Sequence, residues 1–144
     1  MYRSLQCCLA LLMLWVSTCL VGCIDDDHLL TYKVTGKVVF PDGSPLKGGW
    51  IILESPKEGL AARGVIDADG TFQVGTYSQS DGAVAGKQLV AITPATPDGY
   101  DPDRGVAPPT IHQRLMHMDT SGLEIEVKPG GENHIKITVE RPDR

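Results

Sequence analysis

The residue with the most specific chemistry in this sequence is Cys23, which directly follows Leu20, Val21 and Gly22. A cysteine thiol can form a thioether, and a glycine before it leaves room for a peptidase at the bond between them. The other cysteines all lie upstream, at positions 7, 8 and 19. The spacing therefore predicts cleavage after Gly22 and acylation of Cys23, which leaves no cysteine for a disulfide in the exported chain.

The residues before Cys23 have the organisation of an export signal. Arg3 gives a positive start, and Leu5 to Val16 is apolar apart from Gln6. Residues 20–23 resemble a lipobox, so residues 1–22 are predicted to be a bacterial lipoprotein signal peptide. The alternative is an uncleaved transmembrane helix, because Leu5 to Ile24 contains 20 residues without a charge. Both interpretations place the rest of the chain in the cell envelope, outside the cytoplasm and attached to the inner or the outer membrane.

A second group of potential ligands lies near the C-terminal end, where His112, Met116, His117 and Met118 occur within seven positions. Imidazole and thioether donors together suit copper, particularly in an envelope compartment. Once Cys23 is acylated, the exported chain offers no free cysteine and no second ligand cluster to support such a site. We therefore favour the alternative, in which Leu115 and the two methionines pack this segment onto the domain, and we expect no cofactor.

The same part of the chain holds other polar residues that could contact a ligand. Asp98, Asp101 and Asp103 resemble a loose calcium loop, but the full alternating set and the downstream glutamate are missing. Solvated turn residues are the better interpretation. Tyr100, Asp101, Asp103 and Arg114 are retained as candidate binding residues of a long loop.

The motif search argues against an enzyme and against a nucleic-acid-binding protein. The sequence contains no G-x-S-x-G, no H-E-x-x-H and no glycine-rich phosphate loop. Of 13 Lys and Arg residues only Arg3 lies before Cys23, so the exported chain has 12 against 18 Asp and Glu, a net charge of −6. Without a basic cluster, binding to a phosphate backbone is not expected.

The elements that would position these residues are short β-strands. Residues Tyr32 to Phe40 alternate between apolar and polar, which is typical of a half-buried strand, and Gly49 to Glu54 is a continuous apolar run. The run predicts a strand covered on both faces, with Trp50 in the core. Asp67 to Gly70 is a hairpin signal, because its glycine accepts the positive φ that such a turn needs. Further strands are predicted at 60–66, 71–74 and 86–93.

The last two predicted strands are Leu123 to Val127 and His134 to Glu140, which alternate between apolar and charged residues. A proline- and glycine-rich turn joins them, so we expect them to pair with each other. Glu124 or Glu126 would then lie opposite Lys136 as a cross-strand ion pair. No stretch after Cys23 shows a convincing helical period.

About seven strands separated by turns predict an all-β protein with a single β-sandwich domain. The predicted organisation is a signal peptide over residues 1–22, a lipidated N-terminus and short acidic tether over 23–31, and the sandwich over 32–144. The long stretch 94–122 has no strand pattern. Loops of that length are usually functional or mobile, so a binding site is expected there first.

Several short motifs follow one another along the chain: VTGKV at 34–38, DGSPL at 42–46, DADGTF at 67–72, DGAVAG at 81–86, TSGL at 120–123 and VKPGG at 127–131. Their order resembles that of small bacterial lipoproteins with a carboxypeptidase regulatory-like, or transthyretin-like, domain. The resemblance implies an Ig-like or prealbumin-like sandwich in a membrane-anchored, non-catalytic protein. The chain departs from the family pattern at two places. Ile66 stands where the family has threonine, and Ile111 to Asp119 stands where the family has a segment with proline and tyrosine.

The expected function is that of a non-catalytic structural or interaction module in the envelope, with a protein or polysaccharide partner. Tyr100 is a candidate for stacking on a sugar, whereas for Trp50 core packing is favoured. The first alternative is periplasmic copper handling through loop 112–118. The second is a transthyretin-like hydrolase, which is disfavoured because the histidine near the first strand and the C-terminal Tyr-Arg-Gly-Ser that such an enzyme uses have no counterparts here.

Overall fold

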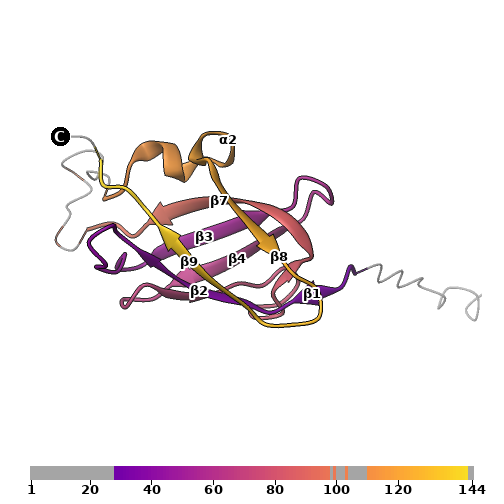
Figure 1. The fold of residues 1–144 in the computed structure, drawn as a ribbon. Helices are drawn as coiled ribbons and strands as arrows, with labels where there is room; N and C mark the ends of the chain where they lie inside the picture. Colours follow the sequence, from indigo (N-terminus) through magenta and orange to yellow (C-terminus); the bar gives the residue numbers. More distant parts are fainter. Residues whose placement is uncertain (1–27, 98, 100–102, 104–109, 143–144) are drawn as a thin grey trace, which may run out of the picture.

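The computed structural model describes residues 28–97, 99, 103 and 110–142, which form an all-β sandwich (Figure 1). Seven strands form one sheet in the order β8-β7-β3-β4-β5-β2-β9, and β1 and β6 form a small second sheet. The predicted all-β fold class is confirmed. The strands are β1 (Thr31–Tyr32), β2 (Val34–Val39), β3 (Gly49–Glu54), β4 (Ala61–Ile66), β5 (Thr71–Gln73), β6 (Ala83–Val84), β7 (Gly86–Pro94), β8 (Leu123–Val127) and β9 (Asn133–Thr138).

The large sheet folds over on itself at the β4–β5 hairpin, where the Ile66–Phe72 pair joins the two strands. The predicted turn lies here, and Gly70 takes a φ of 84°. The Asp69 carboxylate accepts hydrogen bonds from the Thr71 N–H at 3.0 Å and the Thr71 hydroxyl at 2.6 Å. Strands β2 and β9 lie in front of β3 and β4 in Figure 1, so the hairpin carries the chain from one layer to the other.

The core lies between these layers and is supplied by alternate residues of each strand. Val34 and Val38 of β2 are fully buried, as the alternation of this segment predicts. They meet fully buried residues of the opposite layer, among them Ile51, Leu53 and Ile92. A buried aliphatic side chain of this size contributes about 1.5–3 kcal/mol relative to an exposed one.

Strand β3 differs from its prediction, because it is covered on one face only. Ile51 and Leu53 are buried, but Trp50 is 55% exposed and Ile52 is partly exposed. The expectation that Trp50 packs in the core is therefore wrong. A continuous apolar run does not identify which of its residues face outward, and none of the described residues covers Trp50 enough to bury it.

The pairing predicted for the last two strands is also wrong. β8 pairs antiparallel with β7, while β9 pairs parallel with β2, so the chain changes layer between them. Glu124 consequently meets Lys87 of β7, with 2.7 Å between carboxylate and ammonium, in place of Lys136. Alternation identifies a strand and its buried face but carries no information about its partner.

Among the described residues of the stretch 94–122, no strand follows the end of β7 at Pro94, and part of the stretch is helical. A 3₁₀ helix, η2 (Gln113–Met116), is followed by the short helix α2 (Met118–Ser121), which ends at Gly122 with a φ of 65°. Four residues are too few to show a helical period in the sequence. Ile111 and Leu115 are fully buried in the core, so this segment is packed onto the sandwich.

Candidate functional site

The N-terminal end of the described chain is held on the domain. The His28 ring stacks on Tyr77 with 3.9 Å between ring centroids, and the Leu29 N–H donates to the Tyr77 hydroxyl at 3.1 Å. Thr31 then pairs with Val84 as β1 joins β6. Residues 28–31, expected to belong to the tether, thus contact the sandwich. Residues 20–23 lie outside the described residues, and no helix within the described part is long and apolar enough to span a membrane.

Tyr77 is itself positioned by a carboxylate that binds the loop between β5 and β6. Asp81 accepts backbone N–H bonds from Thr76 at 2.8 Å, Tyr77 at 3.1 Å and Ser78 at 3.2 Å. Partial burial alone would raise the pKa of Asp81, but these three donors outweigh it and lower the pKa below its usual range. The ionised carboxylate therefore stabilises the loop that holds His28 and Leu29.

This arrangement predicts a pH dependence of stability that Asp81→Asn should reduce. A carboxyl group with a depressed folded-state pKa stabilises the fold above its unfolded-state value, and that contribution is lost as the pH falls through the folded-state pKa. Urea midpoints measured between about pH 6 and about pH 2 should therefore fall less steeply for Asp81→Asn than for the native chain. Equal slopes for the two proteins would contradict the role of Asp81. Glu126→Gln is the matched control, since the exposed Glu126 carboxylate forms no hydrogen bond or ion pair with the described residues.

A shallow groove on the outer face of β3, β4 and β5 has Trp50 at its edge. The register places Trp50 between Val65 of β4 and Thr93 of β7, and Val65 is 50% exposed beside it. The groove has a volume of about 340 Å³. We call it the Trp50 groove; it is lined by Trp50, Arg63, Gly64, Val65, Asp67, Gln73 and Gln79.

The polar side chains of the Trp50 groove keep much of their hydrogen-bonding capacity. Among the described residues, the Arg63 guanidinium and the Asp67 carboxylate form no ion pair, and Gln79 makes no side-chain hydrogen bond. Gln73 donates to the Ser80 carbonyl at 3.3 Å. The groove therefore combines an exposed aromatic surface with donors and acceptors of both kinds, an arrangement that fits a neutral polar ligand with an apolar face.

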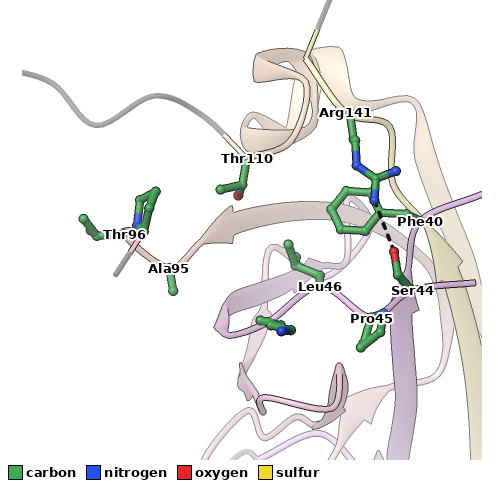
Figure 2. Close-up of a pocket in the computed structure, with 10 residues that line it drawn as sticks. Phe40, Ser44, Pro45, Leu46, Ala95, Thr96, Thr110 and Arg141 are labelled. Atoms are coloured by element: carbon green, nitrogen blue, oxygen red, sulfur yellow. Dashed lines mark hydrogen bonds between the residues drawn. The ribbon is translucent and has the colours of Figure 1, made fainter. Parts of the chain in front are cut away.

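A larger pocket of about 420 Å³ lies at the base of the long loop (Figure 2). Its main cation, Arg141, lies 4.1 Å above the Phe40 ring, donates to the Ser44 hydroxyl at 3.2 Å and pairs with Asp42 at 3.0 Å. Thr110 contributes a buried hydroxyl that finds no hydrogen-bond partner among the described residues. Arg141 thereby joins the C-terminal segment to the β2–β3 turn at the edge of this loop-base pocket.

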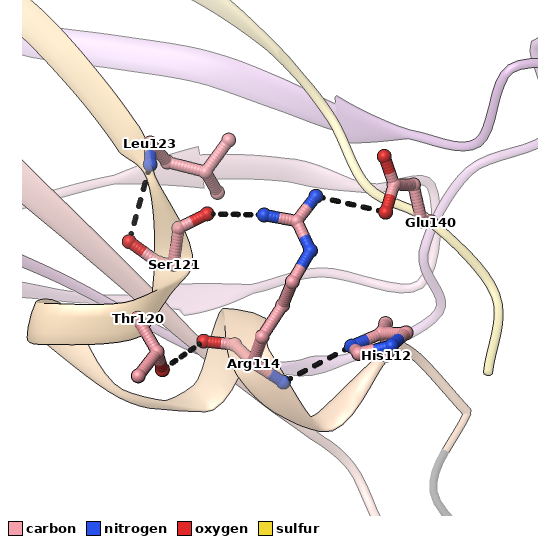
Figure 3. A network of polar contacts seen from close by, with 6 residues as sticks. All are labelled: His112, Arg114, Thr120, Ser121, Leu123 and Glu140. Carbon is pink, nitrogen blue, oxygen red and sulfur yellow. Dashed lines mark hydrogen bonds and ion pairs between the residues drawn. The ribbon is translucent and has the colours of Figure 1, made fainter. Parts of the chain in front are cut away.

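Arg114, a candidate binding residue, holds the helical segment in place (Figure 3), and its role in binding stays a prediction. Its guanidinium donates to the Ser121 carbonyl at 2.7 Å and pairs with Glu140 at 2.8 Å. Its backbone carbonyl accepts from the Thr120 hydroxyl at 2.8 Å, and its N–H donates to His112 Nδ1 at 3.2 Å. These contacts join η2, α2 and the segment after β9, so the charge of Arg114 serves the structure of the domain.

The candidate copper ligands fall on both ends of η2. His112 caps its start and exposed His117 follows its end, while Met116 is partly buried against the core. Across residues 28–97, 99, 103 and 110–142, no three His, Cys, Asp or Glu side chains gather closely enough to hold a metal ion. Packing of Leu115 and Met116 accounts for the apolar part of this cluster. Copper binding by His112, Met116, His117 and Met118 stays a prediction.

The other predicted binding residues of the loop are Tyr100, Asp101 and Asp103, and their role stays a prediction. Asp103 is exposed, and Tyr100 and Asp101 lie outside the described residues. Sequence reasoning did not identify the Trp50 groove, although one signal was present. Residues 61–66 alternate with Arg63 and Val65 on the outer face, and an antiparallel partner necessarily places residues beside them on that face.

The fold and the groove define the chain as a small all-β sandwich with an aromatic surface on one sheet face. The chain matches no protein-family model, no curated protein and no solved structure. The resemblance of its motifs to carboxypeptidase regulatory-like domains stays a prediction.

Proposed function

We propose that this chain is a lipid-anchored, non-catalytic module of the bacterial cell envelope that binds carbohydrate in the Trp50 groove. The single observation that carries the binding part is the 55% exposure of Trp50 beside polar side chains with unused hydrogen-bonding capacity. An indole left in water forfeits part of the stabilisation that burial would give it. Its exposure on a rigid strand is consistent with a site for a ligand.

Carbohydrate fits the groove better than an extended apolar surface of a protein. The apolar C–H face of a pyranose can lie on the indole ring, while its hydroxyl groups both donate and accept hydrogen bonds. Arg63 supplies donors, Asp67 supplies acceptors, and the amides of Gln73 and Gln79 supply both. The opposite charges of Arg63 and Asp67 favour a neutral sugar over a strongly charged one.

The anchor is supported by the sequence before residue 24 and by the position of His28. The export signal and the lipobox at Leu20 to Cys23 predict acylation, and several acyl chains on one residue give stable attachment where a single chain would be marginal. His28, the first described residue, stacks on the domain only five residues after Cys23. A module attached so closely would meet glycans of the envelope rather than distant soluble partners.

Binding can be tested through the intrinsic fluorescence of Trp50, because the second tryptophan, Trp15, belongs to the predicted signal peptide. The processed protein would be titrated in detergent with the neutral tetrasaccharides chitotetraose and cellotetraose. We expect a saturable change in Trp50 emission and a dissociation constant on the order of 0.1–1 mM, which corresponds to about −4 to −5.5 kcal/mol. Absence of any change with either sugar would contradict the proposal.

Calorimetric titration of variants with the same sugars tests whether they bind in the Trp50 groove. Trp50→Ala should weaken binding about tenfold, as expected for the loss of one stacked ring, and Trp50→Phe should retain part of the affinity. Lys47→Ala is the matched control, since Lys47 lines the loop-base pocket and does not line the Trp50 groove. Loss of binding in Lys47→Ala with unchanged binding in Trp50→Ala would assign the ligand to the other pocket.

A further inference from the structure

Three large apolar side chains gather where the chain enters the sandwich. Leu29 is 43% exposed, Leu30 is 78% exposed and Tyr77 is 39% exposed. Leu29 and Leu30 line the same shallow hollow, and the Leu29 N–H donates to the Tyr77 hydroxyl at 3.1 Å, which places Tyr77 beside them. We call these three residues the N-terminal patch. Leaving a leucine in water forfeits up to about 1.5–3 kcal/mol, so a patch of this kind indicates a contact surface.

The N-terminal patch is fixed to the domain on both sides. β1 begins at Thr31, immediately after Leu30, and pairs with β6. Tyr77 lies in the loop whose backbone N–H groups are bound by Asp81, including its own N–H at 3.1 Å. The orientation of the patch is therefore set by the sandwich and does not depend on how the preceding residues lie.

The length of chain before His28 indicates what covers the patch. Four residues, 24–27, separate Cys23 from His28. At about 3.3–3.6 Å per residue, the path from Cys23 to His28 is at most about 18 Å, which is less than the thickness of a bilayer. With acyl chains on Cys23, the patch cannot move far from the lipid headgroups. Asp25, Asp26 and Asp27 would stay hydrated among these headgroups, so the contact is interfacial and does not extend into the hydrocarbon.

We propose that the N-terminal patch of Leu29, Leu30 and Tyr77 rests on the lipid surface and fixes the orientation of the sandwich. The inference rests on the proposed acylation of Cys23 and is independent of carbohydrate binding. Tyrosine suits this position, because its ring favours the membrane interface while its hydroxyl stays polar. The bordering Lys57 is 88% exposed in its side chain, which keeps the rim of the patch solvated.

This orientation places the Trp50 end of the groove away from the membrane, whereas Gln79 at its other end belongs to the same loop as Tyr77. β7 starts at Gly86, two residues after β6, and runs nine residues to Pro94 at the opposite end of the sandwich (Figure 1). Trp50 pairs with Thr93 near that far end, seven residues along β7 from its start. At about 3.3 Å per residue, Trp50 lies roughly 23 Å along β7 from the start of that strand, at the end of the sandwich opposite the patch.

The test uses full-length protein processed in a bacterial membrane and reconstituted into phosphatidylcholine–phosphatidylglycerol vesicles. Because Cys23 would be acylated, an introduced cysteine gives a single site for an environment-sensitive fluorophore. Ala85→Cys lies beside the patch, and Lys47→Cys lies at the far end; both residues are exposed. We expect spin-labelled lipids to quench the fluorophore at residue 85 several-fold more strongly than the one at residue 47.

A variant of the patch separates lipid contact from simple proximity to the anchor. Leu29→Ser combined with Leu30→Ser, in the Ala85→Cys background, should lower quenching toward the level at residue 47. Unchanged quenching in this variant, or equal quenching at residues 85 and 47 in protein whose Cys23 carries acyl chains by mass spectrometry, overturns the inference and leaves the anchor intact. Absence of acyl chains on Cys23 overturns the proposed anchor, and the inference with it.

Discussion

Gly36→Ala is expected to destabilise the sandwich by about 3 kcal/mol or more, a large fraction of the 5–15 kcal/mol that holds a typical domain. Gly36 lies in β2 between β5 and β9, opposite Phe72 and Ile135. A Cβ at this position would lie 2.1 Å from the Ile135 carbonyl oxygen and 2.6 Å from the Phe72 ring. The carbonyl belongs to a strand and the ring is 4% exposed in the core, so neither can withdraw without disturbing its layer.

The measurement is urea unfolding followed by circular dichroism, with the midpoint as the readout. Gly131→Ala is the matched control, because a Cβ there meets nothing within 4 Å. It should change the free energy of unfolding by no more than about 0.5 kcal/mol. A Gly36→Ala midpoint equal to that of Gly131→Ala would show that β2, β5 and β9 pack less closely than described.

Local patterns in the sequence were sufficient to place most strands of this fold. Strands β3 and β8 have the predicted bounds, and the hairpin at Asp67 to Gly70 is confirmed, because alternation and turn chemistry depend on neighbouring residues. Strand pairing depends on distant residues. In the β8–β9 connection, the Asn133 side-chain amide accepts from the Lys128 N–H at 2.9 Å and donates to the Lys128 carbonyl at 3.2 Å. This connection carries the chain to the other layer. Nothing in the local alternation indicates that change.

The candidate site could not be predicted for a related reason. Whether Trp50 lies in the core or on the surface depends on what covers the outer face of β3, and that is a property of the whole fold. The long loop was expected to hold the site, yet its Arg114 is occupied by Ser121 and Glu140, and its Leu115 is buried. Side chains that look available in a sequence can already be engaged in fixing the segment that carries them.

Cys23→Ala is expected to abolish acyl labelling and to leave an unprocessed precursor that retains residues 1–22. Alanine has no thiol, so the thioether cannot form, and cleavage after Gly22 should not follow. Cys19→Ala is the control: it lies in the signal peptide, and the chain should still be labelled and shortened normally. The measurement is metabolic labelling with palmitate, combined with the intact mass of the protein.

Membrane association alone would not distinguish these outcomes. The uncleaved precursor keeps Leu5 to Ile24, whose 20 uncharged residues are long enough to hold it in a bilayer. The retained mass of residues 1–22 and the missing acyl label are therefore the decisive readouts. A Cys23→Ala chain that is still cut after Gly22 and released into solution would contradict the lipobox and indicate an ordinary export signal. In that case the N-terminal patch would no longer be held near lipid, and quenching at residue 85 should fall to the level at residue 47.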